Sequence, residues 1–169
     1  MEAMKFSEMT TSLKIKFLIA SVGGVGLLPK APGTFGSIVA MPILFVPFDI
    51  RIILLPIVLV LAIVLFMAVV PELNNINKHD ASWIVLDEVI GMWVMYALFF
   101  MPLSAMWYVV GFALFRFYDI QKPFPINLIN NQTTVFSIVA DDIVAGIFAA
   151  ITVYLFYHTS LLLPFLYFL

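Results

Sequence analysis

An apolar segment over residues 83–101, WIVLDEVIGMWVMYALFFM, carries two adjacent carboxylates, Asp87 and Glu88. A charged side chain at the centre of a lipid bilayer costs about 2.5–3.5 kcal/mol on insertion scales, so two of them side by side require a compensating partner. The segment is close to the length of about 20 apolar residues that crosses a bilayer. We therefore expect a membrane helix whose acidic pair meets other polar groups elsewhere in the chain.

The composition sets the class of protein. Of 169 residues, 64% are hydrophobic and 11% are charged, against about 25% charged residues in soluble domains. Because the hydrophobic residues come in blocks, we expect one all-α membrane domain, a polytopic helical bundle rather than a β-barrel. The chain has no cysteine, which excludes a thiolate nucleophile, a thiolate metal site and a disulfide. A net charge of −2 without a basic cluster excludes a nucleic-acid partner.

Hydropathy and proline positions predict five membrane spans. They fall at residues 35–47, 52–70, 83–101, 105–120 and 135–158.

The remaining segments are shorter. Residues 1–16 form a polar amino-terminal segment, and residues 17–28 form an apolar run too short to span, which favours an interfacial or re-entrant segment. The tail, residues 159–169, is apolar with a break expected at Pro164, and its placement stays open.

Basic residues orient the predicted bundle, because they concentrate on the cytoplasmic side of membrane proteins. One side holds only Arg51. The other holds Lys5, Lys14, Lys16, Lys30, Lys78, Arg116 and Lys122. We therefore expect the amino terminus and the loops at 71–82 and 121–134 to lie in the cytoplasm.

With this topology the charged residues of the predicted spans form one layer, within roughly 6–11 Å of the cytoplasmic interface. The layer consists of Asp87, Glu88, Arg116, Asp119, Asp141 and Asp142. Gly91 follows Asp87 by four residues, and Gly146 follows Asp142 by four. A small residue on the same face as each acid lets helices approach closely, so we expect the two acidic pairs to meet.

Clustered carboxylates without thiolate or sufficient imidazole suit a hard cation, above all Mg²⁺. Arg116 and Lys122 could balance the charge of a phosphate, and backbone N–H groups of the Gly-rich turn at 34–37 could bind it. The pattern predicts a metal-assisted phosphoryl-transfer site. Several classes of phosphatase and phosphotransferase are excluded, because the sequence has no C-x5-R, D-x-D-x-T/V or D-G-x-x-A-R motif and only two histidines.

Four blocks in this order resemble the phosphatidylglycerophosphatase A family. They are PGTFGS (residues 32–37), HD-x6-DE-x2-GMW (79–93), FR-x2-D-x2-KP-x-P (115–125) and DD-x2-AG (141–146). The resemblance implies an all-α bundle that hydrolyses phosphatidylglycerophosphate, a membrane phospholipid, to phosphatidylglycerol and phosphate with Mg²⁺. It also implies a multi-pass location in a bacterial inner membrane, with the active site facing the cytoplasm and one helix central to the others.

The residue roles follow as a hypothesis. The metal-binding and catalytic set is Asp80, Asp87, Glu88, Asp141 and Asp142, one of which acts instead as base or nucleophile. The phosphate-binding set is Thr34, Gly36, Ser37, His79, Arg116 and Lys122, with Asp119 orienting Arg116. The number of metals and the oligomeric state stay open.

Two other functions fit part of the pattern. Carboxylates within the membrane also mark ion or proton transporters, although these lie near one interface and no inverted repeat accompanies them. A phosphotransferase that passes phosphate to another lipid would need the same site.

Overall fold

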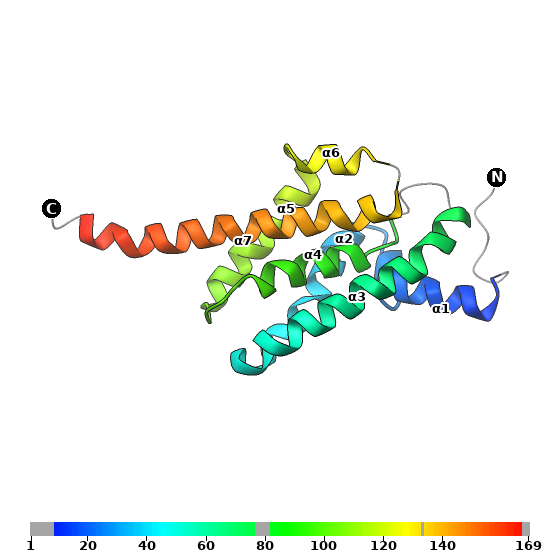
Figure 1. The fold of residues 1–169 in the computed structure, drawn as a ribbon, viewed down its shortest axis with the longest axis horizontal. Coiled ribbons are helices and arrows are strands. Elements are labelled where there is room, and N and C mark those ends of the chain that lie inside the picture. The colour runs from blue at the N-terminus through cyan, green and yellow to red at the C-terminus, as the bar shows by residue number, and fades with distance from the viewer. Residues whose placement is uncertain (1–8, 77–81, 133, 167–169) are drawn as a thin grey trace.

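The computed structural model describes residues 9–76, 82–132 and 134–166, and within these ranges the protein contains helices and no strand (Figure 1). In chain order the elements are α1 Thr11–Ala20, the 3₁₀ helix η2 Val25–Leu27, α2 Pro32–Val39, the 3₁₀ helix η3 Met41–Phe45, α3 Phe48–Ile76, α4 Leu86–Ala97, α5 Ala105–Gln121, α6 Ile126–Asn130 and α7 Val135–Leu166. The all-α prediction is confirmed for the described part of the chain.

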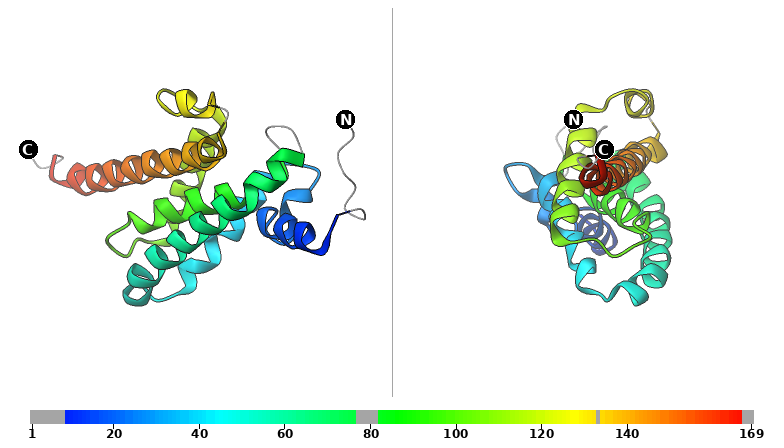
Figure 2. Two further views of the ribbon diagram at one scale, coloured as in Figure 1. Left: turned by 45° about the vertical axis from the view of Figure 1, so that its right-hand side comes forward. Right: turned by 90° about the vertical axis from the view of Figure 1, so that its left-hand side faces the viewer.

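Helix α4 lies at the centre of the fold and packs against α2, α3, α5 and α7 (Figure 2). Nine of its twelve residues are buried. At 1.5 Å per residue it is about 18 Å long, which is short of the roughly 30 Å hydrocarbon core of a bilayer. The prediction of a span over residues 83–101 is therefore wrong. The segment is apolar because most of helix α4 is covered by other parts of the protein. A helix buried in protein is as hydrophobic as one surrounded by lipid.

Two helices of the described chain, α3 and α7, are long and apolar enough to cross a membrane, fewer than the five predicted. With 29 and 32 residues they measure about 43 and 48 Å. Helix α3 extends the predicted span at 52–70 in both directions. Helix α7 continues through Pro164, where a break was expected. A proline this near a helix end removes only one of the last backbone hydrogen bonds.

The predicted span at 35–47 is two short helices instead of one. Helix α2 ends at Val39, and η3 begins at Met41 with Pro42 in its first turn. Proline has no N–H and its ring clashes with the preceding turn, so it fits a helix start and not a helix interior. The bounds of helix α5, by contrast, agree with the segment predicted at 105–120 within one residue, but its 17 residues do not place it among the two helices long enough to span. Residues 17–28 form the end of α1 and η2.

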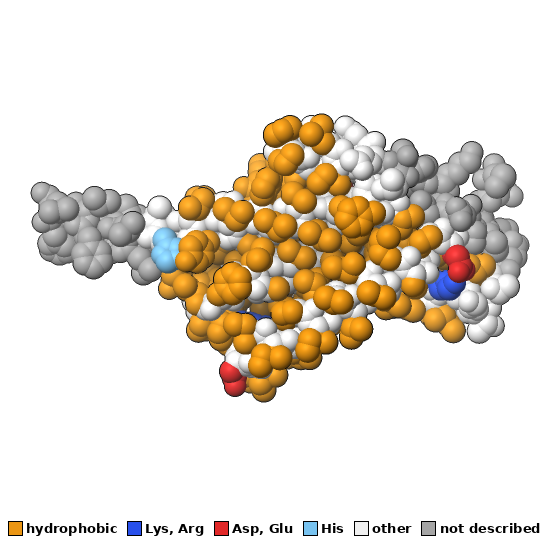
Figure 3. Space-filling model, viewed as in Figure 1, with side chains coloured by type: hydrophobic (Ala, Val, Ile, Leu, Met, Phe, Trp, Pro, Cys, Tyr) orange, Lys and Arg blue, Asp and Glu red, His pale blue; other side chains and the backbone are white. Residues whose placement is uncertain are grey.

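The outer face of α3 is apolar and exposed. Ile53, Val60, Leu61 and Val64 each have at least 60% of their surface accessible. In the space-filling view, hydrophobic side chains cover nearly all of the visible described surface, and charged ones are confined to isolated spots (Figure 3). An apolar surface this extensive marks a lipid or protein contact.

Candidate active site

Two glycines set the distance between α4 and α7. A Cβ on Gly146 would lie 2.3 Å from the Gly91 carbonyl oxygen, and a Cβ on Gly91 would lie 2.7 Å from the Asp142 carbonyl oxygen. Only residues without a side chain allow the two backbones to approach this closely. The prediction that these glycines bring the acidic pairs together is confirmed for Asp87, Glu88 and Asp142, whereas Asp141 pairs with Lys122.

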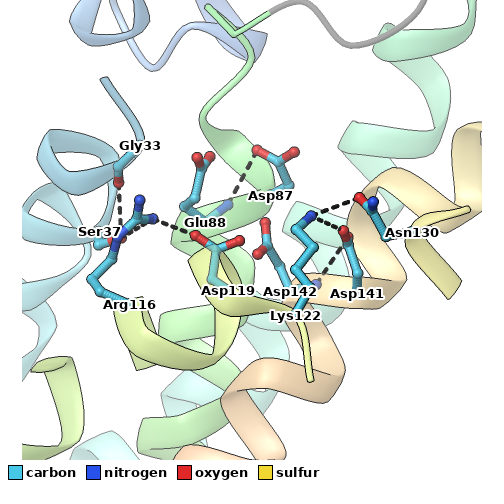
Figure 4. Close-up of polar contacts among 10 residues, drawn as sticks. All are labelled: Gly33, Ser37, Asp87, Glu88, Arg116, Asp119, Lys122, Asn130, Asp141 and Asp142. Carbon is cyan, nitrogen blue, oxygen red and sulfur yellow. Dashed lines mark hydrogen bonds and ion pairs between the residues drawn. The ribbon is translucent and has the colours of Figure 1, made fainter. Parts of the chain in front are cut away.

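Beside this crossing lies a cavity of about 530 Å³, a size common for ligand sites. Its walls come from the start of α2, the first turn of α4, the end of α5, the end of α6 and the early turns of α7. Figure 4 shows the charged side chains converging from α4, the end of α5 and α7. The charged residues lining it are Asp87, Glu88, Arg116, Asp119, Lys122, Asp141 and Asp142.

Arg116 is held by two fixed partners. Its Nη1 forms an ion pair with Asp119 Oδ2 at 2.7 Å, one turn along α5, and donates to Ser37 Oγ at 3.3 Å. The Ser37 hydroxyl in turn donates to the Gly33 carbonyl at 2.8 Å. The guanidinium therefore has a set position, and Asp119 contacts Arg116 directly, which its predicted orienting role requires.

Lys122 is also paired. Its ammonium forms an ion pair with Asp141 and donates to Asn130 Oδ1 at 2.7 Å. Burial alone would lower the pKa of Lys122, but the hydrogen bond and the charge of Asp141 outweigh it and raise this pKa above its usual value. The ammonium therefore stays charged in the cavity at neutral pH.

The cavity is lined by five carboxylates and two cations, and each cation already has a carboxylate partner. Asp87, Glu88 and Asp142 have no cation partner among the described residues, and each offers an oxygen within 4.8 Å of the others. Among the described residues, Glu88 Oε2 and Asp142 Oδ1 are buried without a hydrogen-bond partner. Buried anions this close repel one another, and a bound cation would stabilise them. Oxygen ligands alone suit Mg²⁺, so the donor set fits the predicted metal.

The block PGTFGS forms the start of helix α2 instead of the predicted turn. Helix α2 reaches the cavity with Pro32 and Gly33, whereas Thr34, Gly36 and Ser37 are not part of its lining. Gly36 is buried where a Cβ would lie 2.8 Å from the Val85 side chain, so it serves helix packing. Ser37 reaches the site indirectly, through Arg116.

His79 and Asp80 lie outside the described residues, so their roles stay predictions. Several residues of the cavity lining are absent from the predicted set, among them Gly33 and Asn130. Gly33 lies within the PGTFGS block, which could have indicated it. Asn130 belongs to a polar stretch without any motif, and nothing in the sequence marks it.

The fold and the cavity together define a class of helical protein with an apolar surface. Its cavity holds two oriented cations and three carboxylates that have no cation partner among the described residues. The chain belongs to the phosphatidylglycerophosphatase A family, whose model matches residues 18–157. This range contains every described charged residue of the cavity.

Two of the similar proteins bear the name of this family, and a third bears another name. The chain is 35% identical over 147 residues to the phosphatidylglycerophosphatase A of Haemophilus influenzae, covering 81% of this chain and 85% of the relative. It is 35% identical over 148 residues to that of Escherichia coli, covering 83% of each. A Bacteroides thetaiotaomicron relative, 30% identical over 144 residues (80% of this chain and 89% of the relative), bears a provisional name as a phosphatidylinositol-3-phosphatase. No solved structure matches the chain.

Proposed function

We propose that this protein is a Mg²⁺-dependent lipid phosphatase that hydrolyses phosphatidylglycerophosphate to phosphatidylglycerol and phosphate. Membership of the family and the names of two relatives support the reaction and the substrate. The observation that carries the proposal is the charge pairing in the cavity, where three carboxylates have no cation partner among the described residues and lie beside two oriented cations. A divalent ion and basic side chains in one cavity are the parts that phosphoryl transfer requires.

Asp87, Glu88 and Asp142 would hold the ion, because they are the cavity's unpaired carboxylates. Bound Mg²⁺ would neutralise charge on the phosphate and polarise its oxygens. Asp80, predicted as a further ligand, lies outside the described residues and stays a prediction.

Arg116 and Lys122 would bind the phosphate oxygens. Both line the cavity, and both keep spare N–H donors after their protein contacts, because a guanidinium has five and an ammonium three. Their partners already hold them in place, which removes part of the entropy cost of binding. A carboxylate of the cavity would accept the proton of the attacking water as the phosphorus–oxygen bond to glycerol breaks. The departing glycerol oxygen then takes up a proton and leaves as an alcohol.

The site would lie at the cytoplasmic face of a bacterial inner membrane, in a multi-pass protein. Helices α3 and α7 have the length and apolarity to span, the exposed face of α3 suits lipid contact, and the named relatives are bacterial. The basic residues Arg116 and Lys122 line the cavity, which supports the cytoplasmic orientation.

Product analysis on purified protein in lipid vesicles tests this function. With phosphatidylglycerophosphate labelled in its terminal phosphate, we expect free labelled phosphate with Mg²⁺ and none after chelation. Phosphatidylinositol 3-phosphate, offered at the same concentration, should be hydrolysed more slowly. Label on a second lipid would identify a phosphotransferase instead, and ion flux without phosphate release would identify a transporter.

Gly33→Ala should lower this phosphatase activity more than about tenfold with little change in thermal stability. A Cβ there would lie 2.1 Å from Glu88 Oε1 and 3.2 Å from Arg116 Nη1. Because the Glu88 side chain can rotate away, the metal-binding cluster loses a member and the fold survives. Activity and melting temperature are compared with those of Thr34→Ala, in the same helix but outside the lining. Equal activities of the two variants would show that Glu88 does not need its present position.

A further inference from the structure

Asp141 and Asp142 are neighbours in sequence, yet they face different partners. Successive residues of an α-helix point about 100° apart. Asp142 groups with Asp87 and Glu88 of α4, while Asp141 pairs with Lys122 at the end of α5 (Figure 4).

The two oxygens of Asp141 are both engaged within the protein. Its Oδ1 accepts the backbone N–H of Asp142 at 3.0 Å, and its Oδ2 pairs with Lys122. Asp142 Oδ1, by contrast, is buried without a hydrogen-bond partner among the described residues. Of the two acids, Asp142 is the one with a buried oxygen that no described group contacts.

Lys122 is fixed from three directions. Its backbone caps α5 in the left-handed conformation, with φ at 43°, and its N–H bonds to the Tyr118 carbonyl at 2.9 Å. Its ammonium contacts Asp141 of α7 and Asn130 of α6. An ammonium has three N–H donors, so one donor remains, and the side chain lines the cavity. Without such partners a lysine side chain is flexible and its charge is poorly placed.

We propose that Asn130 and Asp141 are positioning residues that hold the Lys122 ammonium so that its third N–H reaches the substrate phosphate. This rests on the proposed phosphatase function. Asp141 is then not a metal ligand, unlike the role predicted from the sequence. Asn130, an exposed amide at the end of α6, becomes part of phosphate recognition through Lys122.

The variant Asn130→Ala tests whether the Asn130 side-chain amide contributes to phosphate binding. We expect the KM for phosphatidylglycerophosphate to rise about tenfold with kcat within about twofold, because a hydrogen bond to a charged group is lost and the metal is untouched. Asn127→Ala is the matched control, since Asn127 is an exposed amide in the same helix and outside the cavity lining. A KM for Asn130→Ala equal to that of Asn127→Ala overturns the role of Asn130.

A double-mutant cycle shows whether Asn130 acts through Lys122. In a Lys122→Ala background, Asn130→Ala should have no further effect on KM, because its partner is absent. The same loss in both backgrounds would mean that the amide acts on its own, contrary to the proposal.

The affinity for Mg²⁺ distinguishes the proposed role of Asp141 from that of Asp142. Calorimetric titration with Mg²⁺ should give Asp141→Asn an affinity close to that of the wild type and Asp142→Asn no measurable binding. Asparagine keeps the shape of each side chain, so both variants should fold, which circular dichroism checks. Loss of Mg²⁺ binding in Asp141→Asn would make Asp141 a ligand and overturn its positioning role.

The affinity for inorganic phosphate, measured in the presence of Mg²⁺, tests the positioning role of Asn130 separately from the proposed phosphatase function. If Asn130→Ala weakens phosphate binding about tenfold while the wild type does not hydrolyse phosphatidylglycerophosphate, the function fails and the positioning role stands. If hydrolysis occurs and Asn130→Ala binds phosphate as the wild type does, the function stands and the positioning role fails.

Discussion

Asp87→Asn and Asp142→Asn should each abolish most Mg²⁺-dependent phosphate release while the protein stays folded. Both acids belong to the cluster of unpaired carboxylates, one from α4 and one from α7. Losing a partner that merely supports a metal ligand costs about 10–100-fold, so losing a ligand should cost more than about 100-fold. The measurement is phosphate release from phosphatidylglycerophosphate in detergent, at several Mg²⁺ concentrations.

Asp49→Asn is the control for these variants, because Asp49 is an exposed acid in the first turn of α3 and does not line the cavity. It should retain wild-type activity. Near-normal Mg²⁺-dependent release by both folded cluster variants would show that the cluster is not the catalytic site.

The largest effect on stability is expected for Gly146→Ala. Its Cβ would lie 2.3 Å from the Gly91 carbonyl oxygen, and this contact is with backbone, which cannot rotate away. Overpacking a core costs about 1–3 kcal/mol, and we expect the upper end of this range. Separating α4 from α7 would also move Asp142 away from Asp87, so activity should fall with stability.

The matched control is Gly111→Ala in α5, where a Cβ would meet the Met95 side chain, with Sδ at 3.1 Å and Cε at 3.2 Å. Methionine adapts to such a change at low cost. Thermal unfolding followed by tryptophan fluorescence should show a lower melting temperature for Gly146→Ala than for Gly111→Ala. Equal melting temperatures would contradict the close crossing of α4 and α7.

The meeting of Asp87 with Asp142 could be predicted because it depends on local spacing. A glycine four residues after each acid lies on the same face of its helix, and close helix packing at Gly91 and Gly146 then brings the acids together. The bounds of helix α5 could also be predicted from the sequence, because Ser104 and Pro123 flank an apolar run of ordinary helix length.

The length of α4 could not be predicted from its hydropathy. Lipid and protein interior both demand apolar side chains, so residues 83–101 look like a span although only Leu86–Ala97 is helical and most of that helix is buried. The different partners of Asp141 and Asp142 could not be predicted from the sequence either. They depend on how α7 is rotated against α4 and α5, and on a contact from Asn130 in a segment without a motif.

Titration of Mg²⁺ into the purified wild-type protein and into Asp142→Asn, followed by calorimetry, tests the central claim most directly, because it reports the carboxylate cluster without requiring turnover. We predict saturable binding by the wild type and no measurable binding by Asp142→Asn. No binding by the wild type, or equal binding by both proteins, would contradict the assignment of Asp87, Glu88 and Asp142 as the metal site.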